Sequence, residues 1–221
     1  MSHVLARHVG RLTTDEITNA LTSASILCLP IGSFEQHGPH LPLHTDTTIA
    51  VAVAERAARL LAALRPGFIA SSDLQRATMT AAPLARLTGL EVSVDKDLRE
   101  RFGGRWEGLT DTEIRAQFPA EHASWTPPDG EASAVVAHRA KAAMQRVADA
   151  MAPGTLAVVV SHGAAIRLGM SEILGLPQES SGILGPLANC SWSVIERRRE
   201  RWRLLEHNAG TLPEPVLGDD R

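Results

Sequence analysis

The chain lacks several features that would assign it quickly to a functional class. Its two cysteines, Cys28 and Cys190, form no metal-ligand or redox motif, so we expect both to be small buried apolar residues. The formal net charge of −3 excludes a broad electrostatic attraction to nucleic acid or to an anionic membrane. No apolar run reaches the roughly 20 residues of a membrane-spanning helix, and we expect no signal peptide. These absences favour a cytoplasmic protein that has no nucleic-acid partner and no membrane partner.

The composition is that of an ordinary globular protein. The 221 residues are 44% hydrophobic and 21% charged, and this length suits one domain with a substantial core. We expect a single α/β domain over residues 1–208. The remaining segment, 209–221, contains two prolines and ends in acidic residues before Arg221, so we expect a frayed tail.

Short apolar runs alternate with longer amphipathic stretches, which predicts an α/β fold with a mostly parallel central sheet. Residues 156–160 are continuously apolar and are expected to form a central parallel strand. Thr110 and Glu113 have the spacing of a helix-capping box. The expected strands are 26–31, 68–70, 91–94 and 156–160 with a hairpin over 188–206, and the expected helices are 14–22, 48–64, 73–87, 110–117, 132–151 and 163–175.

Three polar side chains follow the expected strands at positions that suit a phosphate site. Arg76 comes in the first turn after a strand end, and its planar guanidinium matches two phosphate oxygens. His162 stands between the strand over 156–160 and a helix, beside backbone N–H groups at a positive helix terminus. Glu100 precedes a Gly-Gly pair, where a loop can aim it inward as a general acid. Taken singly, each is better explained as a surface or structural residue.

The segments SSDLQRATMTA, LRERFGGRWEGLTDTEI and VVVSHGAAIR resemble the histidine phosphatase (phosphoglycerate mutase-like) superfamily over about residues 50–207. The resemblance implies a three-layer α/β/α fold and a phosphomonoesterase that needs no cofactor. It also implies that Arg76 and His162 bind phosphate and that Glu100 donates a proton to the leaving oxygen. PPDGEA, at 127–132, is similar to the family's substrate-side loop.

The chain departs from that family where the nucleophile belongs. The resemblance implies an Arg-His-Gly motif at the end of the first strand, but the sequence there is Pro30-Ile31-Gly32. Arg7-His8-Val9-Gly10 is similar to this motif, although it has one residue inserted and lies too far upstream of the expected position. Losing the nucleophile of a coupled catalytic unit typically costs on the order of 10⁶ in rate. Activity therefore depends on another histidine, such as His8 or His37.

A second group of polar residues indicates metal chemistry. Glu35, His37 and Asp46 lie within twelve residues, with two more histidines between them, and such carboxylate–imidazole sets bind Zn²⁺ or Mn²⁺. The alternative is a solvated histidine-rich loop. The stretch GSFEQHGPHLPLHTD resembles the creatininase (creatinine amidohydrolase) family over about residues 5–58, which implies that these three residues are metal ligands and that Asp46 bridges two ions.

The creatininase family also uses a later histidine and glutamate from a segment that is absent here. The nearest substitute is Ser161-His162-Gly163, which follows a strand in the same way. If residues 26–31 replace the first phosphatase strand, the loop carrying Glu35 leaves the same sheet edge as Arg76, Glu100 and His162. This predicts a composite pocket in which His162 is a fourth metal ligand.

Three functions follow for a domain with a creatininase-like segment (1–58) and a histidine phosphatase-like segment (59–208). The first is a histidine phosphatase-type phosphomonoesterase, or mutase-like protein, acting on a small phosphorylated metabolite, with impaired activity because the nucleophile motif is missing. The second is a divalent-metal-dependent amidohydrolase. The third is a non-catalytic protein that binds phosphate or metal. Both resembled families commonly self-associate, so a homo-oligomer is one expectation.

Overall fold

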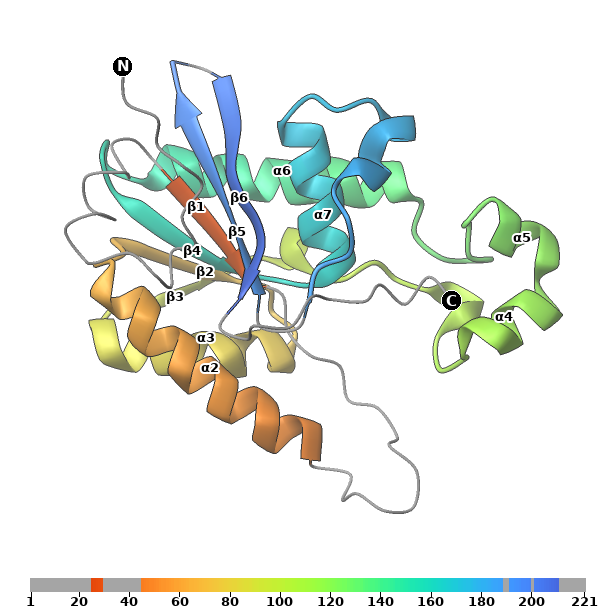
Figure 1. The fold of residues 1–221 in the computed structure, drawn as a ribbon, viewed down its shortest axis with the longest axis horizontal. Helices are drawn as coiled ribbons and strands as arrows, with labels where there is room; N and C mark the ends of the chain where they lie inside the picture. The colour runs from red at the N-terminus through yellow and green to blue at the C-terminus, as the bar shows by residue number, and fades with distance from the viewer. Residues whose placement is uncertain (1–24, 30–44, 189–190, 200, 211–221) are drawn as a thin grey trace.

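The computed structural model describes residues 25–29, 45–188, 191–199 and 201–210, and these contain a six-stranded sheet in the order β3-β2-β4-β1-β5-β6 (Figure 1). β3, β2, β4 and β1 are parallel, while β5 is antiparallel to β1 and β6 is antiparallel to β5. The sheet confirms the predicted α/β class with a mostly parallel centre. The strands are β1 (Ser25–Leu29), β2 (Phe68–Ser71), β3 (Val92–Val94), β4 (Leu156–Val160), β5 (Ser191–Arg198) and β6 (Arg201–Gly210).

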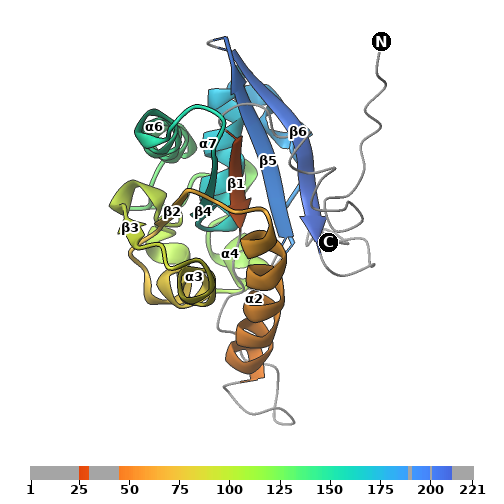
Figure 2. The ribbon, with the colours of Figure 1, turned by 90° about the vertical axis from the view of Figure 1, so that its left-hand side faces the viewer.

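Helices cover both faces of this sheet. Figure 2 shows α2 and α3 on one face and α6 and α7 on the other, which gives the predicted three layers. The α-helices are α2 (Thr45–Ala63), α3 (Gln75–Thr88), α4 (Asp111–Gln117), α5 (Pro119–Ala123), α6 (Ser133–Ala150) and α7 (Gly163–Ile173). The 3₁₀ turns are η2 (Lys96–Leu98), η3 (Gly104–Trp106) and η4 (Gln178–Ile183). No helix of the described segments is long and apolar enough to cross a membrane.

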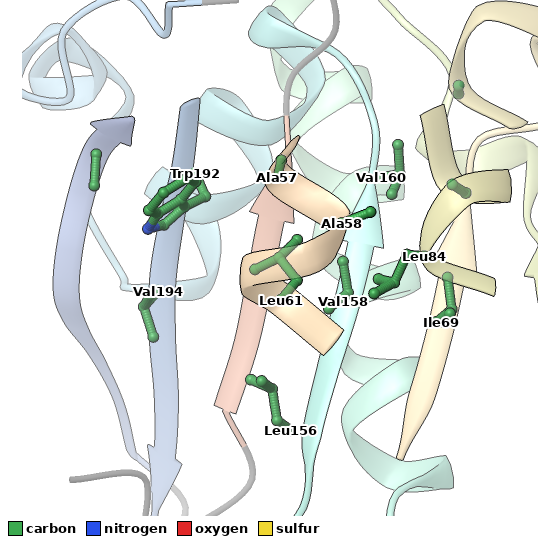
Figure 3. Close-up of a cluster of buried hydrophobic side chains, with 13 residues drawn as sticks. Ala57, Ala58, Leu61, Ile69, Leu84, Leu156, Val158, Val160, Trp192 and Val194 are labelled. Atoms are coloured by element: carbon green, nitrogen blue, oxygen red, sulfur yellow. The ribbon is translucent and has the colours of Figure 1, made fainter. Parts of the chain in front are cut away.

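β4 explains why the core has two halves. All five of its residues are buried, and alternate side chains of a strand point to opposite faces. Val158 packs with Leu61 and Leu84 on the α2/α3 side (Figure 3), whereas Val159 packs with Ile166 on the α6/α7 side. A strand buried on both faces needs the continuous apolar run that the sequence provides.

The register of the parallel strands sets where the site forms. Leu29 of β1 and Ser71 of β2 are both paired with Val160 of β4. The three strands therefore end level with one another, and the residues that follow them leave one edge of the sheet. Ligands of open α/β sheets bind at this edge, beyond the carboxyl ends of the strands.

α7 begins at that edge and is held close to α6. Gly169 lies on α7 where a β-carbon would come within 2.7 Å of the Ala140 β-carbon on α6. The two helices can approach this closely because glycine has no side chain there. The backbone amides at the start of α7 are thereby fixed beside the end of β4.

Some boundaries differ from the prediction. α2 begins at Thr45, so Asp46 belongs to a helix rather than to the expected loop. α5 was not predicted, although proline at a first helical position is a known start signal. β6 continues through Gly210, which pairs with Ser191, so the expected tail from 209 is wrong for its first two residues. The expected helix over 14–22 lies outside the described residues.

The capping box at the start of α4 is confirmed. Glu113 donates its backbone N–H to the Thr110 hydroxyl, and the Glu113 carboxylate accepts the Thr110 backbone N–H at 2.8 Å. Two otherwise unpaired amides are satisfied in this reciprocal arrangement. The segment between β3 and α6 therefore contains short helices, and it forms one wall of the cavity described below.

Candidate functional site

Two of the predicted phosphate ligands are in direct contact. Arg76, in the first turn of α3, donates its Nε–H to His162 Nδ1 at 3.1 Å. The other ring nitrogen, His162 Nε2, lies 3.0 Å from the Ser72 hydroxyl. Because Nδ1 accepts a hydrogen bond, we infer that Nε2 carries the ring proton and donates a hydrogen bond to the Ser72 hydroxyl. The pair sits at the carboxyl ends of β2 and β4, as the sequence predicted.

The surroundings of His162 keep its imidazole neutral. His162 is 2% exposed, and burial, followed by the charges of Arg76 and Arg139, lowers its pKa to about 3. A neutral imidazole contributes hydrogen bonds to an anion but no positive charge. The cation next to it is the guanidinium of Arg76, which has no hydrogen-bond partner for its two terminal nitrogens within the described segments.

The depressed pKa of His162 predicts an acid-sensitive fold. The unfolded chain binds a proton on this ring near pH 6.5, whereas the folded protein does not until about pH 3. The free energy of unfolding should therefore fall as the pH decreases below 6.5. Between pH 6.5 and 4.5 we expect wild type to lose about 1 to 2 kcal/mol more than a His162→Gln variant. Urea titrations at several pH values measure this difference, and parallel pH curves for the two proteins would contradict it.

Glu100 is held at the N-terminus of α7. Its carboxylate accepts the backbone N–H groups of Ala164 and Ala165 at 3.2 and 3.0 Å, and that of Arg101 at 2.8 Å. The sequence suggested that the amides beside His162 are available to a phosphate. In this structure Glu100 uses those of Ala164 and Ala165, because a carboxylate is a favourable partner for a positive helix terminus. Glu100 thus reaches the phosphate-site edge, next to the residues that follow His162.

Arg139, on α6, fixes the loop that carries Glu100. Its guanidinium donates two hydrogen bonds to the Glu131 carboxylate, at 2.6 and 2.7 Å. It also donates to three backbone carbonyls in the segment 97–100. Arg139 holds the pKa of Glu131 below its ordinary value, chiefly through the side-chain hydrogen bond. The sequence analysis missed Arg139, since an arginine inside an alanine-rich helix carries no local signal.

A cavity of about 540 Å³ adjoins this edge. Glu100 and Ala164 form the wall nearest His162, and Trp106, Trp125 and Arg167 line other parts of it. The remaining lining residues are Arg101, Gly103, Ser124, Thr126, Pro127, Ala132, Ser133, Ala134 and Leu168. The PPDGEA segment at 127–132, which the sequence predicted to be a substrate-side loop, contributes Pro127 and Ala132 to this lining.

The predicted metal ligands are not brought together by the described residues. Glu35 and His37 lie outside them, as does His8, and Asp46 is placed only as part of the α2 backbone. Within the described ranges, no three His, Cys, Asp or Glu side chains form a group suited to a metal. His162, the expected fourth ligand, uses both ring nitrogens, for Arg76 and Ser72. The Zn²⁺ or Mn²⁺ site therefore stays a prediction.

Comparison with known families decides the assignment of the chain. The histidine phosphatase superfamily (branch 1) matches residues 47–210, which is more than half of the sequence. The chain belongs to the histidine phosphatase superfamily. A second family, creatinine amidohydrolase, matches residues 10–83. Both matches agree with the segments expected from the motifs.

Individual members of the histidine phosphatase superfamily are similar over most of this chain. A glucosyl-3-phosphoglycerate phosphatase from Mycobacterium tuberculosis is 36% identical over 183 residues, covering 73% of this chain and 80% of its own length. Its counterpart from Mycolicibacterium vanbaalenii is 35% identical over 179 residues, covering 71% of this chain and 80% of its own. The native structure of a mycobacterial glucosyl-3-phosphoglycerate phosphatase, 30% identical, superposes with a TM-score of 0.73 over 86% of this chain and 99% of its own.

These relatives make the chain a histidine phosphatase-type phosphomonoesterase, a class that acts on small phosphorylated metabolites. Arg76, Glu100 and His162 stand in the motifs that carry the superfamily resemblance, and the fold places all three at one sheet edge. The Arg-His-Gly motif is replaced by Pro30-Ile31-Gly32 directly after β1. The structure therefore brings the three motif residues together, while the sequence directly after β1 lacks the Arg-His-Gly motif.

Proposed function

We propose that this protein binds the phosphoryl group of a small phosphomonoester at Arg76 and His162 and hydrolyses it slowly. The observation that carries the proposal is the contact between Arg76 Nε and His162 Nδ1. This contact anchors the guanidinium through one nitrogen and leaves its two terminal nitrogens for phosphate oxygens. An arginine pre-oriented in this way loses less side-chain freedom when it binds an anion.

Hydrolysis in this site requires a nucleophile and a proton donor. His162 is unsuited to attack phosphorus, because both of its ring nitrogens are engaged. We propose that a histidine of the N-terminal segment, His37 or His8, attacks instead, which displaces the alcohol and forms a phosphohistidine that water then cleaves. Glu100 is the proposed donor of the proton that the leaving oxygen takes up. Turnover is slow in this proposal because the attacking histidine does not come from the family's Arg-His-Gly motif and is less well positioned for attack on phosphorus.

The phosphate site is tested by inorganic phosphate binding to wild type and to Arg76→Gln. The variant should bind at least about 10-fold more weakly, since a charge-assisted hydrogen bond contributes about 1.5 to 3 kcal/mol. Arg86→Gln is the matched control, because Arg86 is an exposed arginine on the same helix, α3. Isothermal titration calorimetry measures the three affinities. Equal affinities for wild type and Arg76→Gln would overturn the proposed site.

The creatinine amidohydrolase match over residues 10–83 favours one second candidate, a metal-dependent hydrolase. In that candidate Glu35, His37 and Asp46 would hold Zn²⁺ or Mn²⁺, which activates water for attack. Hydrolysis of an aryl phosphate with and without a strong chelator separates the two functions. Turnover that survives the chelator supports the histidine mechanism, whereas turnover lost with it supports the metal site. A cytoplasmic location and a homo-oligomeric assembly stay predictions from the sequence.

A further inference from the structure

The turn between β5 and β6 carries a concentration of arginine that the phosphate site does not use. A pocket of about 540 Å³ at this turn, here called the arginine pocket, is lined by Arg198, Arg199, Arg201 and Arg203. All four residues are exposed. The formal net charge of the whole chain is −3, so the positive charge of this turn is a local feature that attracts anions to one place.

The strand register directs three of these side chains to one face of the hairpin. Arg198 and Arg201 are directly opposite each other in the antiparallel pairing, and Arg203 follows Arg201 by two residues. Opposite residues, and residues two apart on a strand, share a face of the sheet. Like charges that lie opposite each other destabilise a hairpin. An anion bound between these arginines would therefore stabilise the turn.

Arg199 adds the fourth guanidinium from the turn itself. Its backbone φ is 47°, which lies in the left-handed region that glycine and asparagine adopt most readily. An arginine is an unfavourable choice for this backbone conformation. Local turn preference thus does not explain the residue, whereas a role for its charge does.

Little negative charge compensates the arginine pocket. Arg197, on the opposite face of the hairpin, pairs with Asp149 of α6 and lies over the Trp202 ring. By contrast, the described segments give the four guanidinium groups of the pocket no hydrogen bond or ion pair. Glu196 is the cross-strand partner of Arg203 and is 6% exposed. A single carboxylate leaves most of the positive charge of four arginines uncompensated.

The arginine pocket lies at the opposite end of the sheet from the phosphate site. Ser25, the first residue of β1, pairs with Glu196 near the end of β5, so the β5–β6 turn extends past the amino end of β1 (Figure 1). Arg76 and His162 instead lie beyond the carboxyl ends of β2 and β4, which are parallel within the same sheet. The arginine pocket is therefore a separate site, and it is independent of the proposed function.

We propose that the arginine pocket binds a linear oligophosphate, a chain of three or more linked phosphoryl groups such as tripolyphosphate or the phosphate chain of a nucleoside triphosphate. Guanidinium groups match phosphate oxygens through their planar forks. One phosphate monoester carries about 1.5 to 2 negative charges at pH 7, which is too few for four arginines. The volume of about 540 Å³ suits a small molecule. Confinement of the arginines to one turn favours such a compact ligand over an extended nucleic acid.

Calorimetry with tripolyphosphate and with orthophosphate tests the pocket, at equal ionic strength because salt screens exposed charges. Wild type should bind tripolyphosphate at least about 10-fold more tightly than orthophosphate. Arg201→Gln/Arg203→Gln should weaken tripolyphosphate at least about 10-fold, since it removes two charge-assisted contacts. Arg59→Gln/Arg86→Gln removes the same charge from exposed positions on α2 and α3 and should change the affinity by less than about 2-fold.

Two further arms separate the arginine pocket from the phosphate site and identify the source of the ligand. Arg76→Gln should bind tripolyphosphate as wild type does, even if it no longer binds orthophosphate. ATP should bind wild type at least as tightly as tripolyphosphate does. Equal affinities identify the phosphate chain itself as the ligand, and tighter binding of ATP identifies a nucleotide.

Three results would overturn the proposed oligophosphate site. The first is equal tripolyphosphate affinity in wild type and Arg201→Gln/Arg203→Gln, and the second is loss of tripolyphosphate binding in Arg76→Gln. The third is binding of a thymidine oligonucleotide without binding of tripolyphosphate, which would assign the arginines to a nucleic-acid backbone. If the first double variant does not melt cooperatively, Arg198→Gln/Arg199→Gly takes its place with the same expectation, because glycine suits the φ of position 199.

Discussion

The double variant Pro30→Arg/Ile31→His is expected to raise aryl phosphate turnover by at least about 10³-fold, a fraction of the roughly 10⁶ that a nucleophile contributes. The reason lies in the strand register. Leu29 is the partner of Val160, and Ile31 follows Leu29 by two residues just as His162 follows Val160. The two substitutions would place arginine, histidine and Gly32 in the order of the family motif directly after β1.

The gain should have the signature of a phosphohistidine mechanism. Turnover of the double variant should be insensitive to chelator and should pass through an acid-labile phosphoenzyme. Pro30→Arg/Ile31→Gln is the control, since it introduces the same arginine without a nucleophile. Adding Arg76→Gln should reverse most of the gain, because the phosphate ligand is then lost. A folded double variant that binds phosphate but turns over no faster than wild type would show that the site lacks more than its nucleophile.

Arg139→Ala is expected to lower the free energy of unfolding by about 3 to 5 kcal/mol, because it leaves a partly buried carboxylate without its partner. The side chains of Arg139 and Glu131 are 16% and 19% exposed, and Arg139 also binds three carbonyls of the 97–100 segment. No other described arginine of this protein has hydrogen bonds to so many backbone carbonyls of one loop. Its loss should loosen the segment that positions Glu100.

Urea denaturation of wild type, Arg139→Ala and Arg115→Ala measures this effect. Arg115 forms an exposed pair with Asp111 one turn away on α4, and such pairs contribute about 0.3 to 0.5 kcal/mol, so its variant serves as the control. Arg139→Lys keeps the charge but not the planar fork and should fall between wild type and the alanine variant. A loss below about 1 kcal/mol in Arg139→Ala would mean that the Glu131 loop is held by other contacts.

The elements that the sequence predicted well are those with strong local signals. β4 was recognisable because a strand buried on both faces must be apolar throughout, and the start of α4 was recognisable from its capping box. Arg76 and His162 were found because each lies within a few residues of a strand end and within a family motif. The sequence pattern missed α5 and set the beginning of α2 too late, since helix ends depend on weak preferences that neighbouring segments override.

The sequence by itself determined the α/β class and the family, because both depend on short contiguous patterns. Only the tertiary structure decided that His162 is neutral, that Glu100 occupies the amides of α7, and that Arg139 holds the Glu100 loop. The same is true of the cavity between Trp106, Trp125 and Arg167. These properties come from burial and from contacts between residues far apart in the chain, and no local pattern encodes the distance between two such side chains.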